Sequence, residues 1–558
     1  MTQPVMILLG VGGFVVAVVL LNLILTGQRQ LRLKRDLIAN WGKLPVKRGG
    51  SERYLKAAYL DHEAQVNHDC QIDDLTWQDL DMFDVFKQLN ATQSSVGSER
   101  VYAQLRAYDL GKPDVNETLI SFFQTHAEER LKVQLAFAGL GEDVANNSQH
   151  YLRTTTQSAL PHAWRFKVLG SLPLVGLVLA LVLPAVGVSI IVLSLMVNLF
   201  YYVLKREALD AEVTAMGYLV RTIVTAEHLV KIQQPTQDAL RAAVRPMRGI
   251  TRLAFVFRSR DNSSSDMITE YFSSMFMLGF IAYNNVLTRL YHHHDEALTL
   301  WQALGDLELA IAIANFRTAH SQSSQPVFAA GGMTATKIVH PLLKHPVANP
   351  VAWNKNALIT GANASGKSTY VKSIAVNAIL AQTINTVLAE KLTMQPGLVM
   401  TAMAVRDDLS EGDSYFVAEI KAIHRLLRAV ASNKRVYGFI DEILKGTNTV
   451  ERIAASASVI NWLSHYPSLV VVATHDNELT DIMGDQCINW HFQEKVTQKD
   501  GVVFDYLLHQ GPATSHNAIA LLATMAYPEP LIKDARQLAA DFERNKAWPK
   551  YRQGGIQA

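Results

Sequence analysis

The sequence predicts an α/β domain with a parallel-sheet core in its carboxyl-terminal part, preceded by a largely α-helical region with transmembrane helices. Two observations support this fold class. Short apolar, β-rich runs at residues 357–360, 436–440 and 469–474 alternate with helical stretches, as is typical of parallel α/β sheets. Two runs without any charged residue, 5–25 and 168–204, are long enough to cross a membrane.

The composition of the 558-residue chain agrees with this division. Hydrophobic residues make up 49% of the chain and charged residues only 18%, so the apolar excess belongs in membrane segments. A formal net charge of +2 excludes a globally basic nucleic-acid-binding protein, although local basic patches stay open. Cys70 and Cys487 are the only cysteines, which excludes a disulfide-stapled scaffold and a multi-cysteine zinc module.

Residues 5–25 are interpreted as an uncleaved transmembrane anchor, since twenty helical residues span about 30 Å. The alternative is a signal peptide, which carries a basic region before a shorter apolar stretch. The run at 168–204 would form a helix of about 55 Å, too long for one crossing. Pro184 and Gly187 near its middle favour a two-helix hairpin. The alternative is a buried helix pair in a soluble core, but such helices carry a polar face.

Basic residues flank both runs on one side of the membrane only. They are Arg29, Arg32, Lys34 and Arg35 after the first run, and Arg165, Lys167, Lys205 and Arg206 around the second. The positive-inside rule then predicts a multi-pass cell-membrane protein with three transmembrane segments and its amino terminus outside. Residues 28–167 and 205–558 are expected in the cytoplasm.

These observations predict the order of domains along the chain. We expect a transmembrane anchor at 5–25, a cytoplasmic helical region at 28–165, a transmembrane hairpin at 168–204, a helical core or lever region at 205–334, the α/β domain at 335–540 and a tail at 541–558. Apolar residues three and four positions apart support the second helical region, for example Leu304, Leu307, Ile311 and Ala314.

A phosphate-binding loop follows the first β-rich run. Residues 361–369 read Gly-Ala-Asn-Ala-Ser-Gly-Lys-Ser-Thr and fit the pattern G-x4-G-K-[ST] without deviation. The glycines let backbone N–H groups approach phosphate oxygens at the start of a helix. Lys367 is expected to reach the β- and γ-phosphates of ATP, and Ser368 to hold Mg²⁺. The predicted ATP-binding residues of the loop are Gly361, Asn363, Gly366, Lys367, Ser368 and Thr369.

The second and third β-rich runs end in polar residues that suit ATP hydrolysis. Asp441 can bind Mg²⁺ directly or through water, and Glu442 can polarise the attacking water. His475 follows the third run, where it can hydrogen-bond the γ-phosphate. We therefore expect Glu442, His475 and Lys367 to be catalytic, and Ser368 and Asp441 to hold the metal.

Further motifs resemble the MutS mismatch-repair ATPases, specifically over about 335–540 and more weakly over about 76–330. The motifs are residues 360–370 (P-loop), Asp407-Asp408-Leu409 with 414–419 (DDL…STF…E), 441–449 (DE-x-x-x-G-T-[ST]-T), 473–475 (histidine switch), and His340-Pro341 with 347–349 (start of the ATPase domain). Ala362 and Ala364 replace the usual Pro and Met of the loop, at positions whose side chains the phosphate chemistry does not need. The Phe-x-Glu wedge motif of the mismatch-reading domain has no match before residue 75. The chain thus resembles a membrane-anchored branch of the MutS superfamily that lacks this domain.

The resemblance implies an ABC-like ATPase domain that forms a homodimer, in which the partner completes each site. It implies that Ser414 contacts nucleotide bound by the other subunit, that residues 446–449 lie at the dimer interface, that Glu442 is the general base and that His475 is the sensor. Bound DNA is also an implication of the resemblance. The expected function is a clamp driven by MgATP, with mismatched or branched DNA as one candidate substrate. The alternatives are a transport-type ATPase and a nucleotide-gated membrane scaffold without DNA binding.

An arginine cluster stays open to several interpretations. Within twenty residues the chain carries Arg241, Arg245, Arg248, Arg252, Arg258 and Arg260. We favour a solvated helix face for these residues, and the alternative is a patch that binds DNA phosphates or anionic lipids.

Overall fold

The computed structural model divides into two compact units. Unit 1 contains Met1–Asn67, Phe86–Gln104 and Val115–His320, and unit 2 contains His68–Val85, Leu105–Asp114 and Ser321–Ala558. The structure describes residues 21, 24–25, 27–46, 51–64, 66–111, 113–143, 146–154, 159–160, 162–250, 273–362, 365–403, 415–432, 434–497, 501–513, 519, 522–523, 525 and 527–549. Most of the anchor predicted at 5–25 lies outside these residues, as do Arg252, Arg258 and Arg260.

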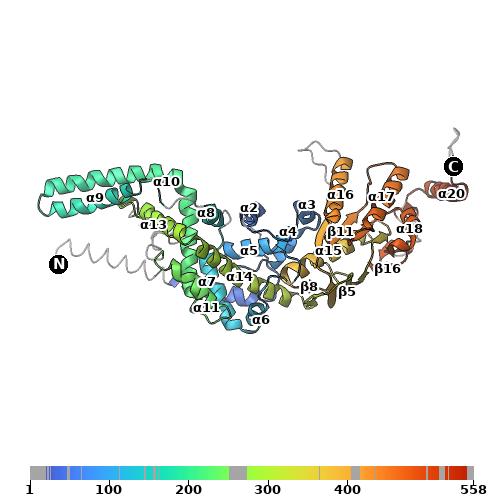
Figure 1. Ribbon diagram of the computed structural model, residues 1–558, viewed down its shortest axis with the longest axis horizontal. Coiled ribbons are helices and arrows are strands. Elements are labelled where there is room, and N and C mark those ends of the chain that lie inside the picture. Colours follow the sequence, from blue (N-terminus) through green and yellow to red (C-terminus); the bar gives the residue numbers. More distant parts are fainter. Residues whose placement is uncertain are drawn as a thin grey trace. The chain divides into compact units, whose positions relative to one another are not determined.

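Unit 1 is built from helices, as the sequence predicts. In chain order they are α2 (Glu52–Glu63), α4 (Met82–Leu89), α5 (Ser95–Arg106), α6 (Glu117–Thr125), α7 (Ala127–Leu140), α8 (Ser148–Thr154), α9 (Trp164–Ala180), α10 (Pro184–Leu229), α11 (Gln237–Val244), the 3-10 helix η1 (Arg245–Met247), α13 (Leu278–His292) and α14 (His294–Ala319) (Figure 1). The first four residues of α4 and the last two of α5 belong to unit 2. The residues Leu304, Leu307, Ile311 and Ala314, singled out by their spacing, all lie on α14 and are buried.

Helix α14 is largely buried in unit 1, and polar contacts hold it at its middle and near its carboxyl end. The buried carboxylate of Glu308 accepts hydrogen bonds from the Ser94 hydroxyl and the Gln93 backbone N–H. Near the carboxyl end, Arg317 makes a bidentate ion pair with Glu117 of α6, with both N–O distances 2.8 Å. The hydrogen bonds to Glu308 and the ion pair of Arg317 offset part of the cost of burying these charges.

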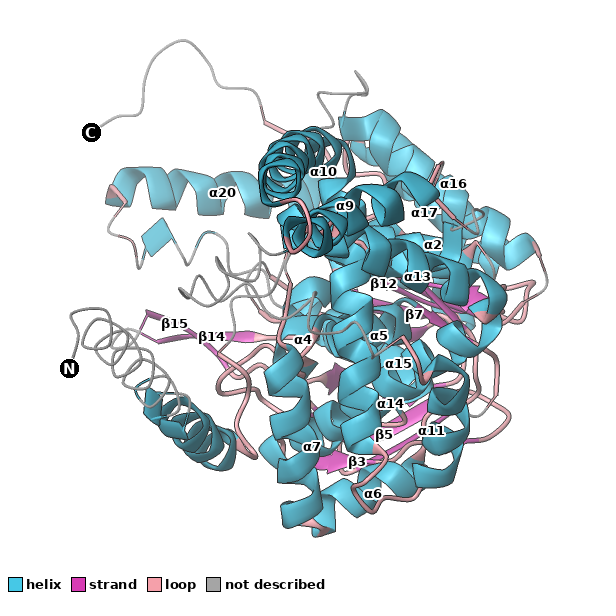
Figure 2. Ribbon diagram, turned by 90° about the vertical axis from the view of Figure 1, so that its left-hand side faces the viewer, coloured by secondary structure: helices cyan, strands magenta, loops and turns pink. Residues whose placement is uncertain are grey.

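Helices α9 and α10 lie side by side as a hairpin with its turn at residues 181–183 (Figures 1 and 2). Glycines allow the two backbones to approach closely, since a Cβ atom on Gly187 would lie 2.2 Å from the Ala180 nitrogen. Among the described residues, two helical segments are long and apolar enough to cross a membrane. His294–Ala319 is 72% buried as a core helix, whereas Pro184–Arg206 is only 17% buried. Membrane crossing itself stays a prediction.

Unit 2 contains the expected α/β fold. Its main sheet has the order β10-β11-β12-β7-β13-β16, in which β16 alone is antiparallel to its neighbour. The strands are β7 (Ala357–Thr360), β10 (Leu398–Ala402), β11 (Val436–Asp441), β12 (Leu469–Ala473), β13 (Ile488–His491) and β16 (His509–Gln510). The helices after β7 are α15 (Lys367–Ile384), α16 (Tyr415–Ala431), α17 (Thr449–Leu463), α18 (Glu478–Met483), the 3-10 helix η3 (Gly484–Gln486) and α20 (Glu529–Asn545).

Smaller sheets complete unit 2. A four-stranded sheet has the order β4-β9-β5-β6, and three two-stranded sheets pair β1 with β2, β3 with β8, and β14 with β15. Their bounds are β1 (Cys70–Gln71), β2 (Ala107–Tyr108), β3 (Ser323–Ser324), β4 (Val327–Phe328), β5 (Met333–Ile338), β6 (Asn349–Trp353), β8 (Val387–Leu388), β9 (Lys391–Met394), β14 (Glu494–Thr497) and β15 (Gly501–Phe504).

Two short segments from early in the chain cover the β10 edge of the main sheet. Helix α3 (Asp74–Asp79) contacts β10, and the Thr401 hydroxyl donates to Asp79 over 2.6 Å. The Tyr108 hydroxyl donates to the Gly397 carbonyl over 3.0 Å. These contacts protect an edge strand that would otherwise expose unpaired backbone groups. The sequence analysis placed both segments in the helical region at 28–165, so the structure adds them to the α/β unit.

Candidate active site at the carboxyl ends of the parallel strands

Three neighbouring strands bring the predicted motifs to one edge of the sheet. Strand β12 lies between β11 and β7, with Ala473 paired with Asp441 on one side and Ile359 on the other. The backbone N–H of Glu442 donates to Ala473 over 2.9 Å, and that of Thr474 donates to Ile359 over 3.0 Å. The carboxyl ends of parallel strands are where α/β folds bind ligands.

The loop after β7 forms a cradle of backbone groups. Gly361 and Gly366 have φ angles of +135° and +105°, and a Cβ atom on Gly361 would lie 2.4 Å from the Phe492 carbonyl oxygen. Glycine is therefore required at residue 361. The buried hydroxyl of Ser365 has no hydrogen-bond partner among the described residues. Helix α15 begins directly afterwards and directs its N-terminal N–H groups at the loop, so the arrangement fits a phosphate group.

Lys367 lies inside this cradle and is buried. Its Nζ atom donates to the carbonyls of Gly361 and Ala362 over 2.7 and 2.9 Å and lies 3.4 Å from Nε2 of His475. The ammonium group is thus held at the mouth of the loop by backbone oxygens, ready to exchange them for phosphate oxygens.

Ser368 and Asp441 face each other, and their side chains form a hydrogen bond. Burial raises the pKa of Asp441 above its ordinary value, against the opposing effect of this hydrogen bond. A hydroxyl and a carboxylate are oxygen ligands that suit Mg²⁺. The pair therefore fits the metal that the sequence predicts.

Glu442 and His475 lie beside this pair. Nε2 of His475 is 3.3 Å from Oε1 of Glu442, and Lys445 also forms an ion pair with Glu442. Burial, followed by the nearby charge of Lys367, lowers the pKa of His475 below its ordinary value, so the imidazole is neutral at pH 7. Glu442 has a φ angle of +58°, a backbone conformation that is uncommon outside glycine and occurs at functional sites.

Sequence analysis missed the ion pair that holds the loop after His475, and it named Glu419 only as part of the 414–419 motif, without its partner. Arg452 on α17 makes a bidentate ion pair with Asp476, the residue after His475, with N–O distances of 2.6 and 2.8 Å. The buried carboxylate of Glu419 on α16 accepts from the Lys445 backbone N–H over 2.9 Å. Each residue lies within a few positions of a recognised motif, but the sequence contains no signal that identifies its partner.

Gly446 brings the loop after Glu442 into direct contact with α16. A Cβ atom on Gly446 would lie 2.8 Å from the ring of Phe416 on α16, so the loop after Glu442 rests directly on that helix. Of the predicted residues, Asn363 and Ser414 lie outside the described part of the chain, as do residues 407–409. Thr369 lies exposed in the first turn of α15.

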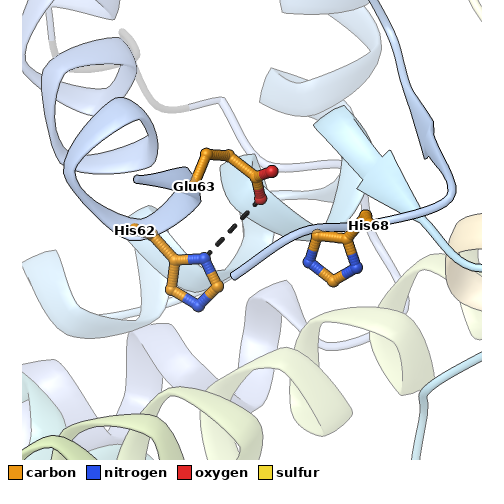
Figure 3. Close-up of side chains that lie close together, drawn as sticks. All are labelled: His62, Glu63 and His68. Carbon is orange, nitrogen blue, oxygen red and sulfur yellow. Dashed lines mark ion pairs between the residues drawn. The ribbon is translucent and has the colours of Figure 1, made fainter. Parts of the chain in front are cut away.

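A separate pair of side chains in unit 1 does not form a comparable site. His62 and Glu63, adjacent on α2, lie 3.7 Å apart between Nδ1 and Oε1 (Figure 3). Both side chains are largely covered, with 22% and 9% of their surface exposed.

The comparisons with known proteins agree with this geometry. Residues 357–543 match the family model of MutS domain V. The chain is 29% identical over 259 residues to the DNA mismatch repair protein MutS of Natronomonas pharaonis, a match that covers 44% of this chain and 30% of that protein. It is 30% identical over 249 residues to the DNA mismatch repair protein MutS 2 of Halobacterium salinarum, covering 42% and 28%. The matches thus span less than a third of either relative.

These findings confirm the predicted ATPase domain. The chain carries a MutS domain V, an ABC-like ATPase domain that binds ATP, and ATPases of this family dimerise. The protein is an ATPase, distantly homologous to MutS mismatch repair proteins over about 44% of its length.

Proposed function

We propose that the protein is a membrane-anchored ATPase in which MgATP binding and hydrolysis open and close a clamp formed by two copies of the chain. One observation carries this proposal. Lys367, the Ser368–Asp441 pair and the Glu442–His475 pair meet at one sheet edge within a MutS domain V.

Each side chain has a task in the hydrolysis of the γ-phosphate. The loop N–H groups and Lys367 bind the phosphates, and Ser368 and Asp441 would hold Mg²⁺. Bound Mg²⁺ would neutralise the charge on the transferring phosphoryl oxygens. Glu442 orients the attacking water and takes its proton. Neutral His475, 3.3 Å from Glu442 and 3.4 Å from Lys367, reports the state of the phosphate to the loop that follows it.

The homodimer would complete each site across its interface. In this proposal Ser414 of one copy contacts nucleotide held by the other, and residues 446–449 lie between the copies. The contacts of α16 support it, because Glu419 and Phe416 bind the loop that follows Glu442. A movement at the start of α16, next to Ser414, is therefore transmitted directly to the general base.

The hairpin of α9 and α10 would anchor the protein in the cell membrane. Its support is the exposure of large apolar side chains around the hairpin, such as Leu193 (66%), Met196 (67%) and Phe200 (69%). Soluble proteins rarely expose a contiguous apolar surface of this extent. With the segment at 5–25 as a further span, the amino terminus lies outside and the ATPase domain in the cytoplasm, as the flanking charges predict.

The clamp is proposed to act on duplex DNA with mismatches or branches. The support is distant, since both relatives are named DNA mismatch repair proteins but their matches cover less than a third of each. A transport-type ATPase or a nucleotide-gated scaffold would use the same ATPase site without DNA. DNA dependence of hydrolysis separates these functions.

The test measures MgATP hydrolysis by the purified full-length protein in nanodiscs, with and without mismatched and branched duplexes. Glu442→Gln should still bind ATP but lower turnover by roughly 10²- to 10⁴-fold. Glu478→Gln, an exposed carboxylate on α18, is the matched control. Normal turnover of Glu442→Gln would refute the assignment of the base. Stimulation by DNA that weakens with salt supports the DNA clamp, whereas hydrolysis indifferent to all DNA would overturn it in favour of a membrane or protein substrate.

A further inference from the structure

A second apolar region follows the hairpin in the chain. Residues 271–288, between Glu270 and Arg289, contain no charged side chain. This stretch of 18 residues is not one continuous helix. Residues 273–275 are helical, residues 276–277 form a turn, and α13 begins at Leu278. Met277 at the break has a φ angle of +53°, so the described part of the stretch, from residue 273, is a broken helix.

Read from Tyr283 back to Met275, the broken helix contacts α10 at positions that move from the polar part of α10 into its apolar part. The Tyr283 hydroxyl donates to Glu212 over 2.9 Å. The Phe280 ring lies 5.1 Å from that of Tyr202. The Met275 carbonyl accepts from Nδ2 of Asn198 over 2.7 Å. From Glu212 to Asn198 is 14 residues of helix, or about 21 Å, and the charged flank at Arg206 lies between them.

The contacts of the broken helix with α9 also move into the apolar hairpin. The Phe280 ring stacks on Phe166 at 5.0 Å. Deeper in the hairpin, a Cβ atom on Gly170 would lie 2.3 Å from the Phe276 carbonyl oxygen, so glycine lets the two backbones touch. Gly170 is the third residue of the uncharged run that begins at Val168, whereas Asn198 lies six residues, or about 9 Å, before the end of that run at Leu204. The break at residues 276–277 thus lies just inside the apolar hairpin, within the first turn of the run on α9 and about 9 Å from its end on α10.

Asn198 joins the three segments at this depth. Its buried side-chain amide donates to the Leu169 carbonyl over 2.9 Å as well as to Met275. The Leu169 carbonyl needs this donor, because Pro173 stands four residues later in α9 and has no N–H to offer. The amide therefore satisfies one carbonyl freed by a proline and one at a helix break. Irregular backbone at membrane depth requires such internal partners.

We propose that residues 273–282 form a re-entrant membrane segment that enters the cytoplasmic half of the bilayer beside α9 and α10 and is held there by Asn198. Helix α13, which contains the second half of this segment, contacts both α9 and α10 (Figure 1). Residues 275, 276, 278 and 281 are the least buried positions of the segment, and the acyl chains of the lipid would cover these. The segment is continuous with lipid-facing side chains of the hairpin, because exposed apolar residues lie on both sides of its contact points, including Val168, Leu199 and Val203. The inference rests on the membrane hairpin proposed above.

Spin labels on single cysteines test the segment and the hairpin separately. In full-length protein with Cys70→Ala and Cys487→Ala, reconstituted in phosphatidylcholine nanodiscs, labels are placed at Met196→Cys on the hairpin, Leu278→Cys on the segment and Asn285→Cys, exposed further along α13. We expect the first two labels to collide more often with oxygen than with a water-soluble nickel chelate, and the third to show the reverse. ATP hydrolysis by each variant verifies folding.

The outcomes distinguish the two proposals. Oxygen preference at residue 196 with nickel preference at 278, or with low accessibility to both reagents at 278, would overturn the re-entrant segment and leave the hairpin intact. Nickel preference at 196 would overturn the membrane hairpin itself.

A variant at Asn198, whose side chain links the segment to α9 and α10, provides the second measurement. Asn198→Leu should release the segment, so that the label at 278 becomes more mobile while the depth of the label at 196 is unchanged. Ser194→Ala is the matched control, because the Ser194 hydroxyl bonds only to its own helix at Ile191 among the described residues. Equal label mobility at 278 in Asn198→Leu and in the unaltered protein would overturn the role of Asn198.

Discussion

The ion pair between Arg452 and Asp476 should stabilise the ATPase domain and hold His475 in place. The two side chains are 23% and 11% exposed and share two charge-assisted hydrogen bonds. Removing one partner of a fully buried pair costs about 3–5 kcal/mol. Since water still reaches part of this pair, we expect Arg452→Ala to cost about 2 kcal/mol of unfolding free energy. For a unit of this size, that lowers the Tm by about 4–8 °C.

A double-mutant cycle measures the coupling directly. Thermal unfolding is followed for Arg452→Ala, Asp476→Ala and the double variant, with Arg428→Ala, an exposed arginine on α16, as the control. The double variant should lose little more stability than either single variant, since each already breaks the pair. Displacement of His475 should also lower kcat by about tenfold or more while the affinity for ATP is retained. Additive losses in the cycle would refute the reasoning.

Three other substitutions or conditions test the site. Gly361→Ala should weaken ATP binding about 10- to 100-fold, because φ is +135° there and the added Cβ atom would lie 2.4 Å from the Phe492 carbonyl oxygen. Gly484→Ala strains a positive φ of +48° after α18, outside the phosphate loop, and should leave ATP affinity unchanged. Equal affinities of the two variants in a binding titration would contradict the loop assignment. Ser414→Ala mixed with unaltered protein should inhibit ATP hydrolysis in the mixed dimers, and activity that merely averages would contradict a shared site. Burial and Lys367 lower the pKa of His475, so the neutral form persists until the pH falls through that lowered value, and the acid limb of kcat/KM should lie below pH 6.5; a limb above 6.5 that His475→Ala abolishes would contradict this.

Much of the nucleotide site could be predicted because its chemically important residues lie in short contiguous motifs. The loop around Gly361 and Gly366 needs special backbone angles that only glycine adopts freely, and Lys367 follows at a fixed distance in the chain. The acidic pair at Asp441 and the histidine at 475 each end an apolar run. Since parallel strands present their carboxyl ends at one edge, these motifs converge there in the folded chain.

The supporting contacts could not be predicted in the same way. Arg452 and Asp476 are 24 residues apart, and their pairing depends on where α17 begins relative to the end of β12. Thr401 and Asp79 are separated by 322 residues, so covering of the sheet edge by α3 is a property of the folded chain alone. Such contacts depend on how helices and strands are placed against one another, and no local sequence pattern determines that placement.

By itself, the sequence determined that this protein binds a nucleotide in a P-loop α/β domain and that it has an apolar hairpin, because backbone angle, charge and hydrophobic length are local properties. Only the tertiary structure decided which side chains support them. Asn198 could be recognised as the donor for Leu169 and Met275 only once α9, α10 and the broken helix lay together. The physical reason is that a buried carbonyl without a donor is costly wherever it lies, but the donor that satisfies it is chosen by packing.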